Sequence, residues 1–196
     1  MLEQMSQRLH ASKTFEDALR RILVDVVALH GAEFGNIQMP TGGGLVIVDQ
    51  HGLDTDFLRT FRKVRSEDGC ACARALKEGR PVIVIDIEAD EAYAPFRTAA
   101  RRAGYRSVQS TPILSNGGTL IGVISTLFAN VHTPTPIEMN TVSLYCRLAG
   151  ERLFVLLESQ ELCAKAQELH EKLYFDAGLG RHGDAHGPHK RDRTAK

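Results

Sequence analysis

The sequence has no tryptophan, few cysteines and no net charge. Among its 196 residues, 24 lysines and arginines balance 24 aspartates and glutamates. A general nucleic-acid binder needs a basic excess for its phosphate contacts, so this balance argues against that class. No apolar run approaches the roughly 18 residues that span a bilayer, and the polar start MLEQMSQRLHASK lacks the apolar core of a secretory signal. Four cysteines are too few for a disulfide scaffold, so we expect a cytoplasmic protein that binds neither nucleic acid nor membrane.

Recognisable enzyme and metal motifs are also missing. The glycines at 42–44 lack GxGxxG spacing, and no GxxxxGK[ST] occurs. Cys70 and Cys72 have no second ligand pair at zinc-finger spacing, which favours two small packing thiols, with Cys70 pointing elsewhere on the helix turn. His182, His186 and His189 stand in a glycine-rich segment, where a solvated cluster is expected. The sequence therefore predicts no catalytic residue, no metal site and no cofactor.

Local patterns predict helices at both ends and antiparallel strands between them. Thr14 and Asp17 resemble a capping box before an apolar helical pattern that ends at Gly31. Thr135-Pro136-Ile137-Glu138 has the same signature, before a helix that is expected to run to about Leu173. Four β-branched residues at 82–85 predict a strand buried on both faces. The other predicted strands are 36–39, 45–48, 106–114 and 120–128, with shorter helices at 54–64, at 70–77 and within 87–105. This order favours an α+β sandwich over a doubly wound parallel sheet.

The hairpin of 106–114 and 120–128 predicts a register and two faces. A two-residue turn at Gly117-Gly118 would place Gln109 opposite Thr126 and Ser110 opposite Ser125. The face with Ser110 is mostly apolar, and we assign it to the terminal helices. The face with Gln109 mixes polar and apolar groups, as the wall of a small-molecule pocket does. A solvated face is the alternative, but the long 87–105 segment is available to cover it. The predicted pocket residues are Ser107, Gln109, Thr111, Ile124, Thr126, Phe128, Tyr93, Phe96, Asp86 and Cys72.

The central residues resemble the GAF domain of bacterial sensor histidine kinases and related signalling proteins. The resemblance spans about 12–158 and is most specific at 69–128. It rests on four motifs: Gly69 to Leu76, Gly79-Arg80-Pro81, the Asp86-Ile87-Glu88 strand end, and the hairpin Ala103 to Pro112 with its partner Leu120 to Thr126. It implies a central antiparallel sheet of five or six strands. The terminal helices would lie on one face, with a ligand pocket under loops and short helices on the other.

The resemblance implies a non-enzymatic sensory module that binds an unknown small molecule and transmits through its terminal helices, with a histidine kinase or other signalling effector as partner. Two alternatives remain: an enzyme of the free methionine sulfoxide reductase type, and a structural dimerisation domain with an empty pocket. Cys72 stands near the place of one reductase cysteine, but 87–105 contains no cysteine. No histidine follows Cys70 or Cys72, so a covalent bilin is not expected. Haem is not excluded, but nothing singles out one histidine among His10, His30, His51 and His132.

The end of the chain predicts a homodimer. Leu148, Val155, Leu162 and Leu169 recur every seven residues, the spacing of a coiled-coil seam. We expect a short parallel contact through these residues, shared with Leu2, Met5 and Leu9 of the N-terminal helix. The predicted organisation is an N-terminal helical extension at 1–11, the sensor domain at 12–158, a helical extension at 159–175 and a disordered His/Gly-rich tail at 176–196.

Overall fold

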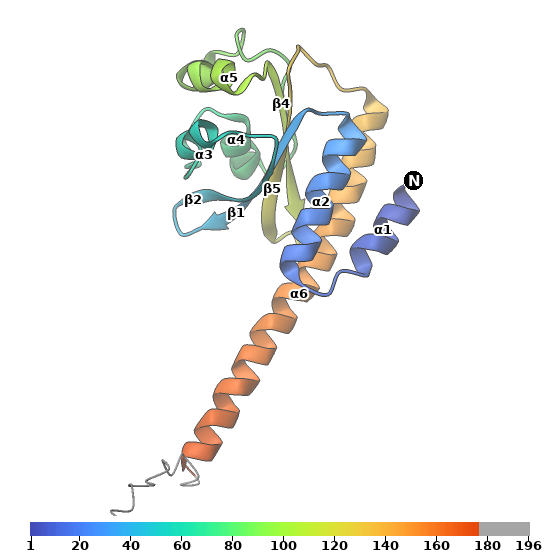
Figure 1. The fold of residues 1–196 in the computed structure, drawn as a ribbon, viewed down its shortest axis with the longest axis vertical. Helices are drawn as coiled ribbons and strands as arrows, with labels where there is room; N and C mark the ends of the chain where they lie inside the picture. Colours follow the sequence, from blue (N-terminus) through green and yellow to red (C-terminus); the bar gives the residue numbers. More distant parts are fainter. Residues whose placement is uncertain (177–196) are drawn as a thin grey trace, which may run out of the picture. The chain divides into compact units, whose positions relative to one another are not determined.

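The computed structural model describes the backbone of residues 1–176 and the side chains of residues 1–170. A five-stranded sheet in the order β2-β1-β5-β4-β3 forms the centre of the compact unit Met1–Glu158. All neighbouring strands are antiparallel. This confirms the predicted α+β class with a central antiparallel sheet (Figure 1). The strands are β1 (Phe34–Thr41), β2 (Gly44–His51), β3 (Val82–Val84), β4 (Ser107–Leu114) and β5 (Leu120–Phe128).

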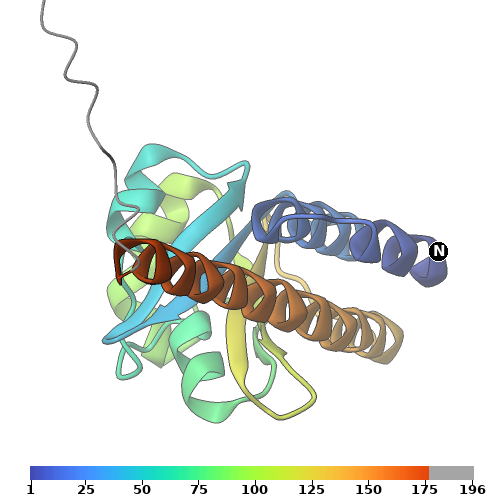
Figure 2. The same ribbon diagram turned by 90° about the horizontal axis from the view of Figure 1, so that it is seen from below.

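The terminal helices cover one face of this sheet. They are α2 (Phe15–His30) and the first part of α6 (Pro136–Asp176), while α1 (Leu2–His10) packs against α2 on the side away from the sheet (Figure 1). Ile37, Ile113 and Ile124 project from the sheet into a core shared with these helices. Figure 2 shows α1 beside α2, and both Met5 and Leu9 of α1 are buried in the same core. The predicted sharing of Met5 and Leu9 in a dimer contact was therefore wrong, because their own domain already covers them.

Short helices cover the opposite face (Figure 1). They are α3 (Thr55–Thr60), α4 (Ala71–Glu78), the 3-10 helix η1 (Glu91–Phe96) and α5 (Arg97–Ala103). Their apolar side chains meet Val108, Val123 and Leu127 of the sheet in a second core. The sheet is thus buried on both faces, as in a three-layer sandwich.

Capping hydrogen bonds confirm the predicted starts of α2 and α6. Thr14 accepts a hydrogen bond from the Asp17 backbone N–H, and Gly31 ends α2 in the left-handed conformation with φ 57°. At the start of α6, Thr135 Oγ1 accepts from the Glu138 N–H while Glu138 accepts from the Thr135 N–H. Each capping box satisfies backbone donors that a helix end leaves without a partner.

The strand register is confirmed over most of the hairpin, with one difference at its end. Gln109 pairs with Thr126 and Ser110 with Ser125, but a bulge between Ile113 and Leu114 moves Leu114 opposite Leu120. Ser115 donates its backbone N–H to Thr119, so the loop holds three residues and not two. The bulge absorbs the additional residue and preserves the rest of the register.

Two further expectations need comment. Strand β3 lies at the sheet edge and Ile85 beyond it is 45% exposed, so the prediction of a strand buried on both faces was wrong. The predicted tail at 176–196 lies, beyond Asp176, outside the described residues. Residues 159–176 continue as helix in a second compact unit that begins at Ser159. Among the described helices, none is long and apolar enough to cross a membrane.

A buried carboxylate links the three terminal helices. Asp25 of α2 accepts a 2.6 Å hydrogen bond from the Tyr145 hydroxyl of α6 and a 3.0 Å bond from Arg8 of α1. Asp25 is only 9% exposed, so its charge depends on these donors for compensation. Burial together with the Asp25 carboxylate raises the pKa of Tyr145 well above its usual value. The hydroxyl therefore remains a donor at any ordinary pH.

We expect Tyr145→Phe to lower the free energy of unfolding by about 2 kcal/mol, because it removes a hydrogen bond to a buried charge. Urea denaturation measures the change. Arg21→Ala is the matched control on α2, since Arg21 pairs with the half-exposed Asp17 one turn away and its loss should cost under about 0.5 kcal/mol. Equal losses in the two variants would contradict a stabilising role for the buried bond.

Candidate functional site

The polar face of the hairpin lies against the terminal helices, not in a pocket. Thr126 Oγ1 lies 2.8 Å from Nδ1 of His30 on α2. Ile124, two residues away on the same face, packs in one core with Leu153 of α6. The predicted face assignment was therefore wrong, although the register was correct. The correction applies to Ser107, Gln109, Thr111, Ile124, Thr126 and Phe128, which all lie on this helix-covered face.

The physical reason is that this face finds most of its polar partners locally, although Oε1 of Gln109 has none. Gln109 Nε2 donates to Thr111 Oγ1 on the same strand. Ser107 Oγ bonds to the backbone oxygens of Val84 and His132. Nδ1 of His30 lies within hydrogen-bond distance of the Thr126 hydroxyl. Polar groups that satisfy one another can be buried under helices, so polarity alone did not identify the pocket side.

A small cavity lies on the other face, beneath the short helices. About 20 Å³ is open to a molecule of water size, which is enough for one or two waters. The sheet forms one wall, while α3, α4 and η1 supply the other. Of the predicted site, Cys72 and Tyr93 line this cavity, and Phe96 lies beside it against Tyr93 and Phe61. The lining residues are Asn36, Gln38, Phe57, Phe61, Ala71, Cys72, Tyr93, Val108, Ser110, Ser125 and Leu127.

A row of polar side chains crosses the sheet wall of the cavity. Asn36 of β1 pairs with Ser125 of β5, which in turn pairs with Ser110 of β4. The two serine hydroxyls lie 2.8 Å apart and bond to each other. On one side of this row, Leu127 and Val108 form an apolar row. The register thus places one band of hydrogen-bonding groups in a mainly apolar wall, as ligand pockets commonly do.

Two side-chain oxygens in this cavity have no hydrogen-bond partner in the protein. They are Oδ1 of Asn36 and Oε1 of Gln38, in residues that are 3% and 1% exposed. A buried amide oxygen without a donor costs about 1 to 3 kcal/mol, and most such groups in folded proteins are satisfied. No charged side chain lines the cavity. The site therefore offers hydrogen-bond acceptors to a neutral donor, water included.

The helical wall of the cavity carries aromatic rings and two thiols. Phe57 and Phe61 stack at 4.5 Å between ring centroids, and the Tyr93 hydroxyl bonds to that of Tyr105 at 2.9 Å. Burial raises the pKa of both tyrosines, so both stay protonated. Sγ of Cys70 lies 3.5 Å from Sγ of Cys72, so the expectation that Cys70 points elsewhere was wrong. The hydrogen bond from Cys72 lowers the pKa of the Cys70 thiol.

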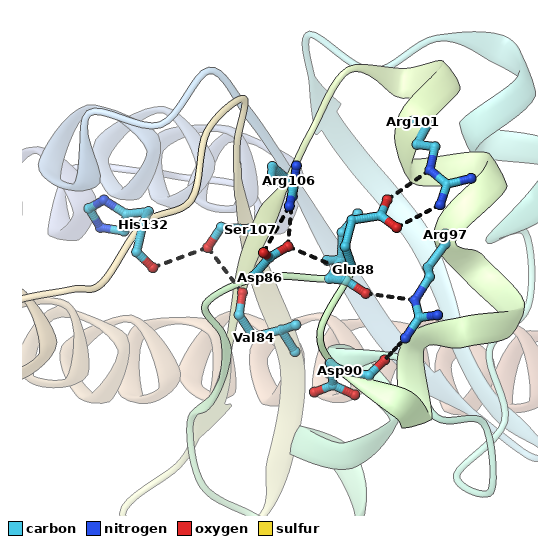
Figure 3. Close-up of polar contacts among 10 residues, drawn as sticks. Val84, Asp86, Glu88, Asp90, Arg97, Arg101, Arg106, Ser107 and His132 are labelled. Carbon is cyan, nitrogen blue, oxygen red and sulfur yellow. Dashed lines mark hydrogen bonds and ion pairs between the residues drawn. The ribbon is translucent and has the colours of Figure 1, made fainter.

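Asp86 lies outside the cavity, in a network of ion pairs at the sheet edge. Its carboxylate accepts two hydrogen bonds from Arg106, at 2.7 and 2.9 Å, while Glu88 accepts two from Arg101 (Figure 3). The Arg106 guanidinium lowers the pKa of Asp86 to about 2. Arg97 donates to the backbone oxygens of Ile87 and Asp90. These bonds hold the segment from Asp86 to Arg106 in place, so Asp86 positions the cover of the cavity and does not line it.

Comparison with known proteins identifies the family to which this fold belongs. The family model described as the GAF domain matches residues 12–153. The chain belongs to the GAF domain family. A search of the curated proteins finds no significant match. Solved GAF-like structures share the fold at low sequence identity, and three are informative.

One similar structure is a domain of a two-component sensor histidine kinase protein from Sinorhizobium meliloti, with TM-score 0.64 and 16% identity over 80% of this chain and 99% of that one. A second is the bacteriophytochrome RpBphP3 from R. palustris, with TM-score 0.66 and 14% identity over 93% of this chain and 43% of that one. A third is free methionine-R-sulfoxide reductase from Neisseria meningitidis in complex with its substrate, with TM-score 0.64 and 15% identity over 81% of this chain and 89% of that one. At these identities the likeness establishes the shared GAF fold.

Sequence reasoning missed most of the cavity wall in this GAF domain. Asn36 and Gln38 stand two apart in a strand whose intervening residue, Ile37, is apolar. That alternation was a usable signal for a polar row facing away from the Ile37 core. Ser110 and Ser125 were correctly paired but assigned to the wrong face. Among residues 1–170, no group of three or more His, Cys, Asp or Glu side chains is arranged to hold a metal ion.

His30 predicts a measurable pH dependence of stability. Burial lowers its pKa from 6.5 to about 4, and the nearby His132 adds to this while Glu138 opposes it. As pH falls below 6.5, the unfolded chain binds a proton at this residue that the folded domain does not. The free energy of unfolding should therefore fall between pH 6.5 and about 4, by up to about 3 kcal/mol at 1.36 kcal/mol per pKa unit. Urea denaturation of wild type and His30→Gln across this range tests it, since Gln keeps an amide donor for Thr126 but does not titrate. An identical pH slope in both proteins would contradict the assignment.

Proposed function

We propose that this GAF domain is a non-enzymatic sensory or regulatory module in bacterial signal transduction. Its cavity beneath α3, α4 and η1, which in this structure has room for a molecule of water size, would widen to bind a small neutral molecule, and the bound state would bias the terminal helices. The observation that carries the proposal is the pair of unpartnered buried oxygens, Asn36 Oδ1 and Gln38 Oε1, in an uncharged cavity. A ligand with hydrogen-bond donors would satisfy both. A histidine kinase or another signalling effector is the partner that the GAF fold suggests.

Strand β5 offers a physical link from the cavity to the helices. Ser125 lines the cavity, and the next residue, Thr126, bonds to His30 of α2 on the opposite face. On β1, Ile37 likewise stands between Asn36 and Gln38 and packs in the core of the terminal helices. A shift of either strand on ligand binding would move both faces together. A ligand biases the helices only if it prefers one arrangement of these strands, which is the requirement for coupling.

The ligand proposal is tested by Gln38→Met. We expect the purified protein to retain a small molecule in native mass spectrometry, and the variant to lose it. The same change should raise the stability of the ligand-free domain by about 1 kcal/mol, because it removes a buried oxygen without a donor.

The matched control is Gln109→Met. Gln109 Oε1 is also buried without a partner, but it lies on the helix-covered face. This variant should retain the ligand. An empty wild-type domain at every stage of purification would instead favour the structural dimerisation module, and equal ligand loss in both variants would remove the cavity from the proposal.

A reductase remains the alternative, because Cys72 lines the cavity and one similar structure is a free methionine-R-sulfoxide reductase. Purified protein that reduces free methionine sulfoxide, with loss of activity in Cys72→Ser, would favour it over the sensory module.

We also propose that the module is a homodimer held by α6. Its apolar residues at seven-residue spacing remain accessible: Val155, Leu162 and Leu169 are 48%, 68% and 60% exposed, and Leu148 is half-buried. In a single chain this periodic stripe leaves apolar area in water, and a second copy in parallel register would cover it. The same stripe would carry a helical signal to an effector.

Replacing Leu162 and Leu169 together with Glu should give a folded monomer, since a charge in the seam opposes association and neither residue belongs to the two cores. Sedimentation at tens of micromolar measures the state. Gln160→Glu with Gln167→Glu is the charge-matched control on the same helix and should stay dimeric. A wild-type monomer would contradict the dimer proposal.

A further inference from the structure

Two thiols face each other at the start of α4, and the GAF fold alone does not account for them. Sγ of Cys70 and Sγ of Cys72 lie 3.5 Å apart, and both residues are buried. Packing alone would place small apolar groups here equally well. Two sulfurs in contact have a further property, because they can form a bond with each other without a large movement of the chain.

The cavity gives this pair a defined route of access. Cys72 lines the cavity, and Cys70 is not among the lining residues. The open volume of about 20 Å³ admits a molecule of water size and excludes bulky reagents. Asn36 and Gln38 line the same space, and their unpartnered side-chain oxygens would accept the O–H donors of such a molecule.

We propose that Cys70 and Cys72 form a redox-active dithiol that hydrogen peroxide oxidises to an intramolecular disulfide. The hydrogen bond between the two sulfurs, together with the Ala73 backbone N–H, stabilises one negative charge on the pair. This supports a reactive thiolate, because the pKa of Cys70 is lowered by these bonds. The bond to Cys70 and burial raise the pKa of Cys72, so Cys72 holds the shared proton at rest and passes it to Cys70 as its own sulfur reacts at the cavity.

The chemistry balances with the peroxide as the only co-reactant. Sγ of Cys72 bonds to one peroxide oxygen, the O–O bond breaks, and the departing oxygen takes up a proton and leaves as water. Cys72 is then a sulfenic acid. Sγ of Cys70 attacks Sγ of Cys72, the S–O bond breaks, and hydroxide takes the remaining thiol proton to leave as a second water. The two thiols lose two electrons and two protons, and one hydrogen peroxide becomes two waters.

This proposal and the ligand proposal concern the same cavity but have different readouts, thiol oxidation here and a retained mass there, so either one can fail alone. Hydrogen peroxide is added to the purified full chain, which is then digested with trypsin without reduction. Both cysteines fall in one peptide, Ser66 to Arg74, and the other two fall elsewhere. We expect this peptide to lose two hydrogen atoms, to regain them with dithiothreitol, and to react before Cys163, which is exposed and has no neighbouring thiol in the described residues.

Single variants distinguish the two roles. In Cys70→Ala, oxidation should stop at a Cys72 sulfenic acid that a 1,3-diketone probe traps. In Cys72→Ala, Cys70 should stay reduced, because it does not line the cavity. For each peroxide, the rate of oxidation of the wild-type pair is divided by the rate of oxidation of Cys163. This ratio should be much lower for the bulky cumene hydroperoxide than for hydrogen peroxide.

A peptide that stays reduced while Cys163 is oxidised would overturn the proposal, and so would equal oxidation of the two single variants. If this ratio of rates were the same for cumene hydroperoxide and hydrogen peroxide, the proposed access through the cavity would be wrong. The wild-type measurement needs no substitution, so it decides the main question even if a variant fails to fold.

Discussion

Burial of both faces of β4 and β5 is the constraint on which the rest of this structure depends. A strand places successive side chains on opposite faces, and here helices cover each face. Every residue from Ser107 to Ile113 is buried, so each polar group must find a partner on its own side. On the side of the terminal helices, Thr126 finds His30 and Gln109 finds Thr111. On the cavity side the hydroxyls of Ser110 and Ser125 bond to each other. Unpartnered amide oxygens remain on both faces, those of Asn36 and Gln38 on the cavity side and that of Gln109 under the terminal helices.

A difference in packing between the two faces explains how one sheet can serve both stability and binding. The face beneath α2 and α6 is closed by large apolar side chains and by the Asp25–Tyr145 hydrogen bond. The opposite face keeps a small open volume with unused acceptors. An unsatisfied buried oxygen destabilises the empty domain, so the same groups that favour a ligand lower the stability without one. Functional sites commonly show this opposition between stability and binding.

The segment from Asp86 to Arg106 shows how charge fixes the cover of the cavity. Its carboxylates and guanidinium groups pair with one another at the sheet edge (Figure 3). Tyr93 contributes its ring to the cavity from η1, inside this braced segment. The pairs are partly exposed, so each stabilises the fold only weakly, but together they restrict the positions that η1 and α5 can take. Asp86 therefore affects the cavity indirectly, because its ion pair helps to position η1 and α5 over it.

Local signals in the sequence determined the elements and most of the register. Capping boxes at Thr14 and Thr135, the glycine at position 31 and the β-branched runs act over a few residues, so the sequence alone predicts where helices and strands begin. The motifs around Gly69 and Asp86 were enough to predict the GAF architecture.

What remained open was which side of the hairpin meets which helices. A period of two divides a strand into two sets but does not say which set faces the cavity, and Thr126 with Gln109 looked like pocket residues until His30 and Thr111 were found beside them. The contact between Cys70 and Cys72, and the row from Asn36 to Ser110, join residues through backbone turns and strand pairing, so only the tertiary structure decided them.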